Sequence, residues 1–330
     1  MNRPARACLA CLFLSVPALA QDYDFDWAVI DHPGNVAYPG DPEFGSNAGR
    51  GSVPYTYRMP KLETTTAQWM EFLNTFRAQG YNMSDAVPNW WGARDAGNRY
   101  ALRSGIPSPE LVPVQGITWR WAAKYCNWLH NGKSAAFDSM LNGAYDASTF
   151  GTLDNGRFTD QLYHSPGAKF WIPTLDEWLK AAHFDPSKNN GAGGWWEYNT
   201  TSDTAPIPGP PGVGQTSAGY RTTGLPQWDY PLGSYPDTTS PWGLLDLSGG
   251  AQEWLEETDS TLRRFRGLDG TFAACFESYL EVDKAGATDG AFPSQRGAAG
   301  LRIASSVPCS PTILTFAAPG VALLIPRRRC

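Results

Sequence analysis

The residues best suited to chemistry lie in one glycine-rich loop, Trp242-Gly-Leu-Leu-Asp-Leu-Ser-Gly-Gly-Ala-Gln-Glu-Trp254. Two acidic residues, Asp246 and Glu253, flank its turn at Ser248-Gly249-Gly250. Such a loop can direct two carboxylates and several backbone carbonyls to one point, and oxygen ligands of this kind suit a hard cation. The alternative is a turn in which both carboxylates accept backbone N–H bonds.

Thiols and imidazoles are sparse and scattered. Neither Cys126 nor Cys275 belongs to a C-x-x-C or zinc-type cluster. In an oxidising compartment the two could pair, and the alternative is that each is a small buried apolar group. The histidines form no metal-binding motif, and no serine-hydrolase or nucleotide-binding motif is present. They are His32, His130, His164 and His183.

Three amphipathic helices are expected to position these groups. Thr66 is the expected cap of a helix over residues 67–79, with Trp69, Phe72, Leu73 and Phe76 on one face. A second helix is predicted over residues 119–130. The third begins at Thr174, because Thr174-Leu-Asp-Glu177 has the pattern of a capping box.

The remaining chain is rich in glycine, proline and aromatic residues, with 14 Trp, 14 Tyr and 15 Phe. This composition favours a loop-rich domain whose core is held by aromatic side chains. Together with the helices, the short strands predict an α+β domain with mostly antiparallel pairing and much irregular loop. The expected strands are 27–30, 55–59, 169–172, 263–266 and 301–304.

The N-terminus has the pattern of a secretory signal. A basic start with Arg3 and Arg6 precedes an apolar run, and Ala18-Leu-Ala20 matches a cleavage site. Residues 1–20 are therefore predicted to be a signal peptide. The alternatives are a lipoprotein signal, which the early positions of Cys8 and Cys11 fit poorly, and a buried helix.

The C-terminal segment is also patterned. An apolar run over residues 312–326 is interrupted by Pro319-Gly320 and followed by Arg327-Arg328-Arg329. It is short for a spanning helix, which needs roughly 17–25 residues. Residues 307–330 resemble a PEP-CTERM sorting tail, although Pro308-Cys-Ser-Pro311 replaces the usual Pro-Glu-Pro. The resemblance implies a membrane sorting protease as partner; a plain membrane anchor is the alternative.

Charge limits the class of partner. The formal net charge of −6 becomes −8 without Arg3 and Arg6, and −11 without the three tail arginines. An acidic protein without basic runs is not expected to bind nucleic acid.

Five segments in order resemble the formylglycine-generating-enzyme (sulfatase-modifying factor) family over residues 22–306. The resemblance implies the C-type-lectin-like fold of that family. The segments are Tyr57–Asn74, Pro113–Leu129, Phe170–Trp178, Trp242–Trp254, and the unit that opens at Arg266-Gly267 and closes at Gly300-Leu301-Arg302.

The resemblance carries two metal expectations. In catalytic members of the family, two cysteines in the last unit bind copper and oxidise a substrate cysteine. Here Cys275 is alone, because Leu280 stands where the second thiol is expected, so copper binding is not expected. The family's calcium ligands correspond to Asp246, Gly249, Ala251 and Glu253, which makes Ca²⁺ the expected cofactor. Gly250 and Gln252 depart from the family pattern.

These features predict a secreted or cell-envelope protein that is a non-catalytic binding or structural module. Its partner would be a carbohydrate or a protein at the cell surface, and Trp90-Trp91 and Trp195-Trp196 could stack on it unless they anchor loops. The alternative is a metal-dependent oxidoreductase of the same family, with Cys275 as the only candidate catalytic residue.

Overall fold

In a computed structural model, the described residues are 22–41, 47–88, 93–220, 230–258, 261–267, 282, 290–296 and 299–308. The predicted signal, most of the predicted tail, Trp90-Trp91, Cys275 and Leu280 lie outside them. One compact unit spans Ala20–Val307. Among the described residues, no helix combines the length and apolar character that a membrane span requires.

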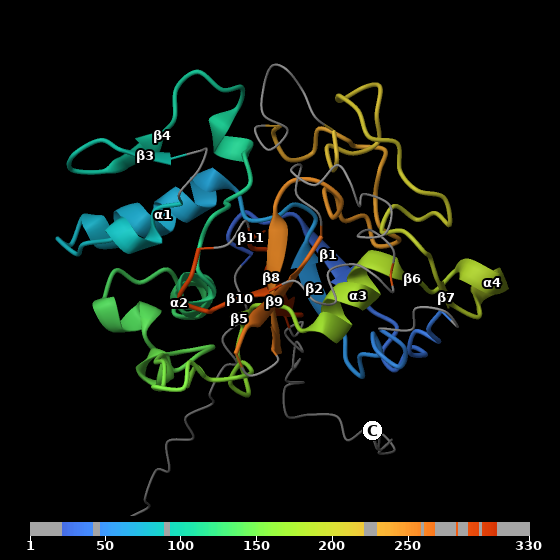
Figure 1. The fold of residues 1–330 in the computed structure, drawn as a ribbon, viewed down its shortest axis with the longest axis horizontal. Helices are drawn as coiled ribbons and strands as arrows, with labels where there is room; N and C mark the ends of the chain where they lie inside the picture. Colours follow the sequence, from blue (N-terminus) through green and yellow to red (C-terminus); the bar gives the residue numbers. More distant parts are fainter. Residues whose placement is uncertain are drawn as a thin grey trace, which may run out of the picture. The chain divides into compact units, whose positions relative to one another are not determined.

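The described residues form four α-helices. They are α1 (Thr66–Arg77), α2 (Trp119–His130), α3 (Leu175–His183) and the short α4 (Lys188–Gly191). Capping boxes start α1 at Thr65 and α3 at Thr174. In Figure 1, α1 and α2 lie to the left of the central strands and α3 lies to their right. Single 3₁₀ turns occupy Ser84–Ala86, Pro109–Leu111, Phe137–Met140 and Ala147–Thr149.

The first sheet joins distant parts of the chain in the order β1-β2-β12-β5, and all of its pairs are antiparallel. It brings β12, at the end of the domain, between two earlier segments. Its strands are β1 (Trp27–Ile30), β2 (Tyr57–Pro60), β5 (Phe170–Trp171) and β12 (Ala304–Ser306).

The second sheet has the order β10-β9-β8-β11, with β8 and β11 parallel and the other pairs antiparallel. Its long strand β8 leaves the glycine-rich loop directly. The members are β8 (Gln252–Thr258), β9 (Arg263–Arg266), β10 (Gly290–Ala291) and β11 (Ala299–Gly300). Two hairpins complete the described strands: β3 (Ala93–Asp95) with β4 (Tyr100–Leu102), and β6 (Phe184–Asp185) with β7 (Gly194–Trp195).

Aromatic side chains fill the core, as the composition predicts. The indoles of Trp69, Trp119, Trp128, Trp178 and Trp254 are completely buried. A buried indole N–H usually pairs with an acceptor, and three of these donate to backbone carbonyls: Trp69 to Ala86, Trp119 to Leu255 and Trp254 to Ile117. The Trp128 N–H has no acceptor among the described residues. The core therefore fixes loop carbonyls as well as packing helices on sheets.

Several boundary predictions are wrong. Helix α1 ends at Arg77 rather than at residue 79, and the strand predicted at 55–59 is β2, which covers Tyr57–Pro60. Thr65, not Thr66, caps α1, because its hydroxyl accepts the Gln68 N–H while the Gln68 side chain accepts the Thr65 N–H. The predicted strand at 301–304 is replaced by β11 and β12 on either side of Leu301-Arg302. The chain changes sheets between them, since β11 pairs with β8 and β12 pairs with β2 and β5.

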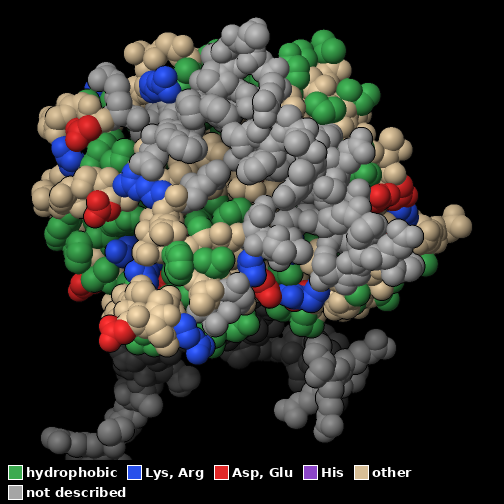
Figure 2. Space-filling model, in the orientation of Figure 1, with side chains coloured by type: hydrophobic (Ala, Val, Ile, Leu, Met, Phe, Trp, Pro, Cys, Tyr) green, Lys and Arg blue, Asp and Glu red, His purple; other side chains and the backbone are tan. Residues whose placement is uncertain are grey.

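On the face shown in Figure 2, charged side chains of both signs are interspersed among apolar and neutral ones wherever the residues are described. Mixed charge of this kind is typical of soluble protein surfaces.

Candidate functional site

The glycine-rich loop ends in a buried ion pair. Glu253, on β8, accepts from the Arg302 Nε at 2.8 Å and from the Trp178 indole at 2.5 Å. Arg302 and Glu253 are 0% and 2% exposed. The other guanidinium nitrogens donate to the carbonyls of Pro60, Lys61 and Leu245. Arg302 therefore joins β2, the loop and β8 at one point.

A third charged group, Glu63, completes the cluster. Both of its carboxylate oxygens lie 3.2 Å from the Ala251 N–H, and its side chain is buried. Burial raises the pKa of Glu63 well above the usual value, the charge of Glu253 raises it further, and Arg302 opposes the shift. The buried surroundings therefore disfavour the ionised form of Glu63.

Glu63 also explains why the last residue of the turn is a glycine. Gly250 has φ = 64°, and a Cβ atom there would lie 2.2 Å from the Glu63 Oε1. A side chain at this position is therefore excluded twice, by backbone conformation and by contact with a buried carboxyl group.

We expect Gly250→Ala to destabilise the fold more than the matched control Gly243→Ala. Both glycines have positive φ, but a Cβ on Gly243 meets no atom within 4 Å. The left-handed conformation alone costs about 1–2 kcal/mol in each variant, and overpacking adds about 1–3 kcal/mol in Gly250→Ala. Denaturant unfolding measures the difference; equal losses in the two variants would show that Glu63 moves freely away.

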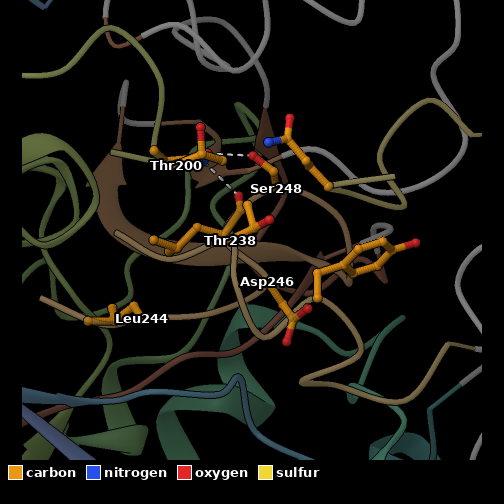
Figure 3. Close-up of a pocket in the computed structure, with 9 residues that line it drawn as sticks. Thr200, Thr238, Leu244, Asp246 and Ser248 are labelled. Carbon is orange, nitrogen blue, oxygen red and sulfur yellow. Dashed lines mark hydrogen bonds between the residues drawn. The ribbon is translucent and has the colours of Figure 1, made fainter. Parts of the chain in front are cut away.

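Asp246 lies at the start of the turn, beside a small cavity shown in Figure 3. Its Oδ2 accepts the Gly233 N–H at 2.7 Å, and its backbone has φ = 59°. Burial raises the pKa of Asp246 to about 6, and the charge of Glu253 contributes to the shift. The cavity volume is about 10 Å³, the space of roughly one water molecule. Its polar walls include Thr200, Thr238 and Ser248, labelled in Figure 3.

The four residues predicted to bind calcium thus lie around one turn, but their roles differ. Each Glu253 oxygen already accepts a donor, from Arg302 or from Trp178. The Ala251 N–H binds Glu63, and a Cβ on Gly249 would meet the Ser217 hydroxyl at 2.4 Å. Among the described side chains, no Lys or Arg forms an ion pair with Asp246, whereas Glu253 pairs with Arg302. Within the described residues, no three His, Cys, Asp or Glu side chains form a metal-binding group. Calcium at Asp246, Gly249, Ala251 and Glu253 stays a prediction.

The thiol in the described part of the chain does not fit a copper site. Cys126 lies on α2 with 0% exposure, and burial raises the pKa of its thiol well above the usual value. Copper favours soft thiolate ligands, and this thiol is enclosed by the core with no exposed surface. Cys275 lies outside the described residues, so the predicted alternatives for a pair with Cys126 stay predictions.

One polar array was missed from the sequence. The His164 Nδ1 lies 3.0 Å from the Glu256 Oε1, which also accepts from the Tyr145 hydroxyl and from the His164 N–H at 2.8 Å. Burial alone would lower the pKa of His164, but the hydrogen bond and charge of Glu256 raise it. The residues are too far apart in sequence for a motif to reveal them. Glu256 stands next to Glu257 in a polar stretch after Trp254, so its burial could not be read from its neighbours.

The tryptophan pair at the end of β7, Trp195 and Trp196, anchors a loop. The Trp195 indole donates to the Val36 carbonyl, and its ring packs edge-on against Tyr38 and Phe184. Trp196 donates to Asp185, and the Lys188 ammonium lies 3.6 Å from its ring centroid. The anchoring interpretation therefore fits this pair better than an open stacking surface.

The described residues form short strands and few helices, and the pair of Glu253 and Arg302 stabilises the glycine-rich loop. These features define the class of protein. Residues 28–306 match the sequence profile of the "Sulfatase-modifying factor enzyme 1-like domain". The chain belongs to this family, and the predicted α+β fold is confirmed.

Solved structures are similar at low sequence identity. "Treponema denticola variable protein 1" aligns with a TM-score of 0.50 and 17% identity, over 84% of this chain and 94% of that one. A structure titled "Crystal Structure of CarF" gives the same TM-score and identity, over 86% of this chain and 99% of that one. At this identity the likeness concerns the fold alone. A search of curated proteins found no match.

Proposed function

We propose that this protein is a non-catalytic binding or structural module of the cell envelope. The observation that carries the proposal is the state of the thiols. Catalysis in the family depends on two thiolates for copper, whereas the last unit here has Cys275 alone, with Leu280 at the position of its partner. The complete burial of Cys126 in α2 argues against it as a replacement ligand.

The proposed location follows from the chain ends. Residues 1–20 have the pattern of a secretory signal, and residues 307–330 have that of a sorting tail. A membrane sorting protease would act on this tail, and the remaining domain would face the outside with a carbohydrate or protein as its ligand.

Metal analysis tests the proposal. The purified mature protein is loaded with copper(I) without oxygen, dialysed and measured by mass spectrometry, and a second sample is measured as purified. We expect much less than one equivalent of copper or iron in the wild type. The matched variant Leu280→Cys restores the thiol pair at the family spacing and should gain copper.

The alternative function, a metal-dependent oxidoreductase, makes the opposite prediction. About one equivalent of copper or iron in the wild type, or oxidation of a cysteine-containing peptide that Cys275→Ser abolishes, would overturn the binding-module proposal. Bound calcium alone is compatible with it.

A further inference from the structure

A second cleft lies at the start of α3. None of the residues that line it belongs to the cluster of Glu63, Glu253 and Arg302. Its volume is about 220 Å³, far above the roughly 10–15 Å³ that one water needs. It combines two exposed tyrosines with three charged side chains. The lining consists of Arg50, Ser52, Val53, Pro54, Tyr55, Tyr163, Thr174, Asp176 and Glu257.

The first tyrosine is an exposed ring in a fixed orientation. Tyr55 is 43% exposed, yet its hydroxyl donates to the Glu177 Oε1 at 3.0 Å. Glu177 is itself buried, and it accepts from the Trp171 indole at 3.1 Å and from the Thr174 N–H at 2.8 Å. Because the hydroxyl is anchored, a ligand stacking on this ring loses little side-chain entropy on binding.

The second tyrosine, Tyr163, is 61% exposed. Its backbone is held on both sides, since its carbonyl accepts from the Gln161 side chain at 2.6 Å and the next N–H donates to Glu256. An exposed aromatic ring on a fixed backbone presents apolar area and a hydroxyl to the same ligand.

The polar side of the cleft is an ordered charge network. The Arg50 Nε lies 2.9 Å from the Asp176 Oδ1, and its NH2 group lies 2.9 Å from the Glu257 Oε2. The Gly51 N–H also donates to Asp176 at 2.7 Å. All three side chains are about one-third exposed, so each has hydrogen-bonding capacity left for a ligand.

We propose that this cleft binds a neutral pyranose unit of a glycan. Tyrosine rings fit the apolar face of a sugar ring, and fixed carboxylate and guanidinium groups fit neighbouring hydroxyls as acceptors and donors. Two carboxylates against one guanidinium give the cleft a net negative charge, which disfavours uronic acids and sulfated sugars. The inference deepens the proposed function by naming the ligand class of the module.

The test uses the mature protein on an array of neutral, uronic-acid and sulfated oligosaccharides, followed by calorimetry on the neutral sugars that bind. We expect neutral sugars to bind and Tyr163→Ala to weaken them at least tenfold. Tyr81→Ala, which removes another exposed tyrosine outside the cleft, should leave the affinity unchanged. Thermal unfolding confirms that both variants fold.

A conservative variant separates recognition from structure. Glu257→Gln keeps the shape and removes one negative charge, so binding of uronic-acid sugars relative to neutral ones should rise. The inference is overturned if neutral sugars fail to bind at millimolar concentration, if only charged sugars bind, or if Tyr163→Ala binds like the wild type. Such failure leaves the copper and iron measurement unaffected, so the two proposals fail separately.

Discussion

Arg302→Met should destabilise the protein by about 3–5 kcal/mol, the range observed when one partner of a buried ion pair is removed. The variant leaves Glu253 buried beside Trp178 with no cation, and the carbonyls of Pro60, Lys61 and Leu245 each lose the hydrogen bond from the guanidinium group. Since domains are stable by only about 5–15 kcal/mol, the loss approaches the whole margin. Chemical denaturation of the purified domain measures it.

A double-mutant cycle shows whether the charge of Glu253 is the cause. Glu253→Gln keeps an acceptor for the Trp178 indole, so it should cost less in the Arg302→Met background than in the wild type. Asp26→Asn is the surface control, because its partner Lys61 is 40% exposed and Asp26 itself 71%, and exposed pairs contribute about 0–1 kcal/mol. A loss of similar size in Arg302→Met and Asp26→Asn would refute the role assigned to the buried pair.

The helices and the aromatic core could be predicted because their signals are local. The Thr174–Glu177 capping box and the spacing of Trp69, Phe72 and Phe76 depend on neighbours within one or two turns. The cap of α1 was misplaced by one residue because three threonines, Thr64 to Thr66, stand in a row. Only the reciprocal bonds with Gln68 distinguish Thr65 from the others.

Strand β8 could not be recognised for a tertiary reason. Gln252 to Glu256 are all buried, so the strand lacks the alternation that marks a half-exposed strand. The buried acids Glu253 and Glu256 further hide the apolar character of the strand. Their partners are distant in sequence, because Glu253 pairs with Arg302 and Glu256 with His164.

The candidate site was located but not fully assembled from the sequence. The turn that contains Asp246 and Glu253 is local, and glycines mark it. Glu63 lies nearly two hundred residues earlier, and a buried arginine such as Arg302 contradicts the general preference of its residue type for the surface. Only the folded chain shows that Glu253 is already paired and that Asp246 is the carboxylate left beside the cavity.

Calcium should cancel most of the stability that the wild type loses relative to Asp246→Asn at high pH. The folded-state pKa of Asp246 is raised from 3.8 to about 6. Its protonated form therefore favours the folded state below pH 3.8, and this advantage disappears as the pH rises through 6. With chelator at pH 8, ionised Asp246 costs the wild type about 3 kcal/mol at 1.36 kcal/mol per pKa unit. Asp246→Asn keeps an acceptor for the Gly233 N–H and should be the more stable protein.

Calcium changes this balance because it favours the ionised carboxylate. At a hundred times its dissociation constant, a ligand specific to the folded state stabilises it by about 2.7 kcal/mol, which offsets most of the cost of ionisation. Thermal and denaturant unfolding separate the cost of ionisation from the gain on calcium binding. The measurements compare the wild type, Asp246→Asn and the control Asp237→Asn. Each protein is measured at pH 5 and pH 8 with chelator, magnesium or calcium. If calcium stabilises Asp246→Asn as much as the wild type, the ion binds elsewhere. If calcium stabilises neither protein, the turn does not bind calcium. Glu63, Glu253 and Arg302 then hold the turn, and Asp246 stabilises the fold only in its protonated form.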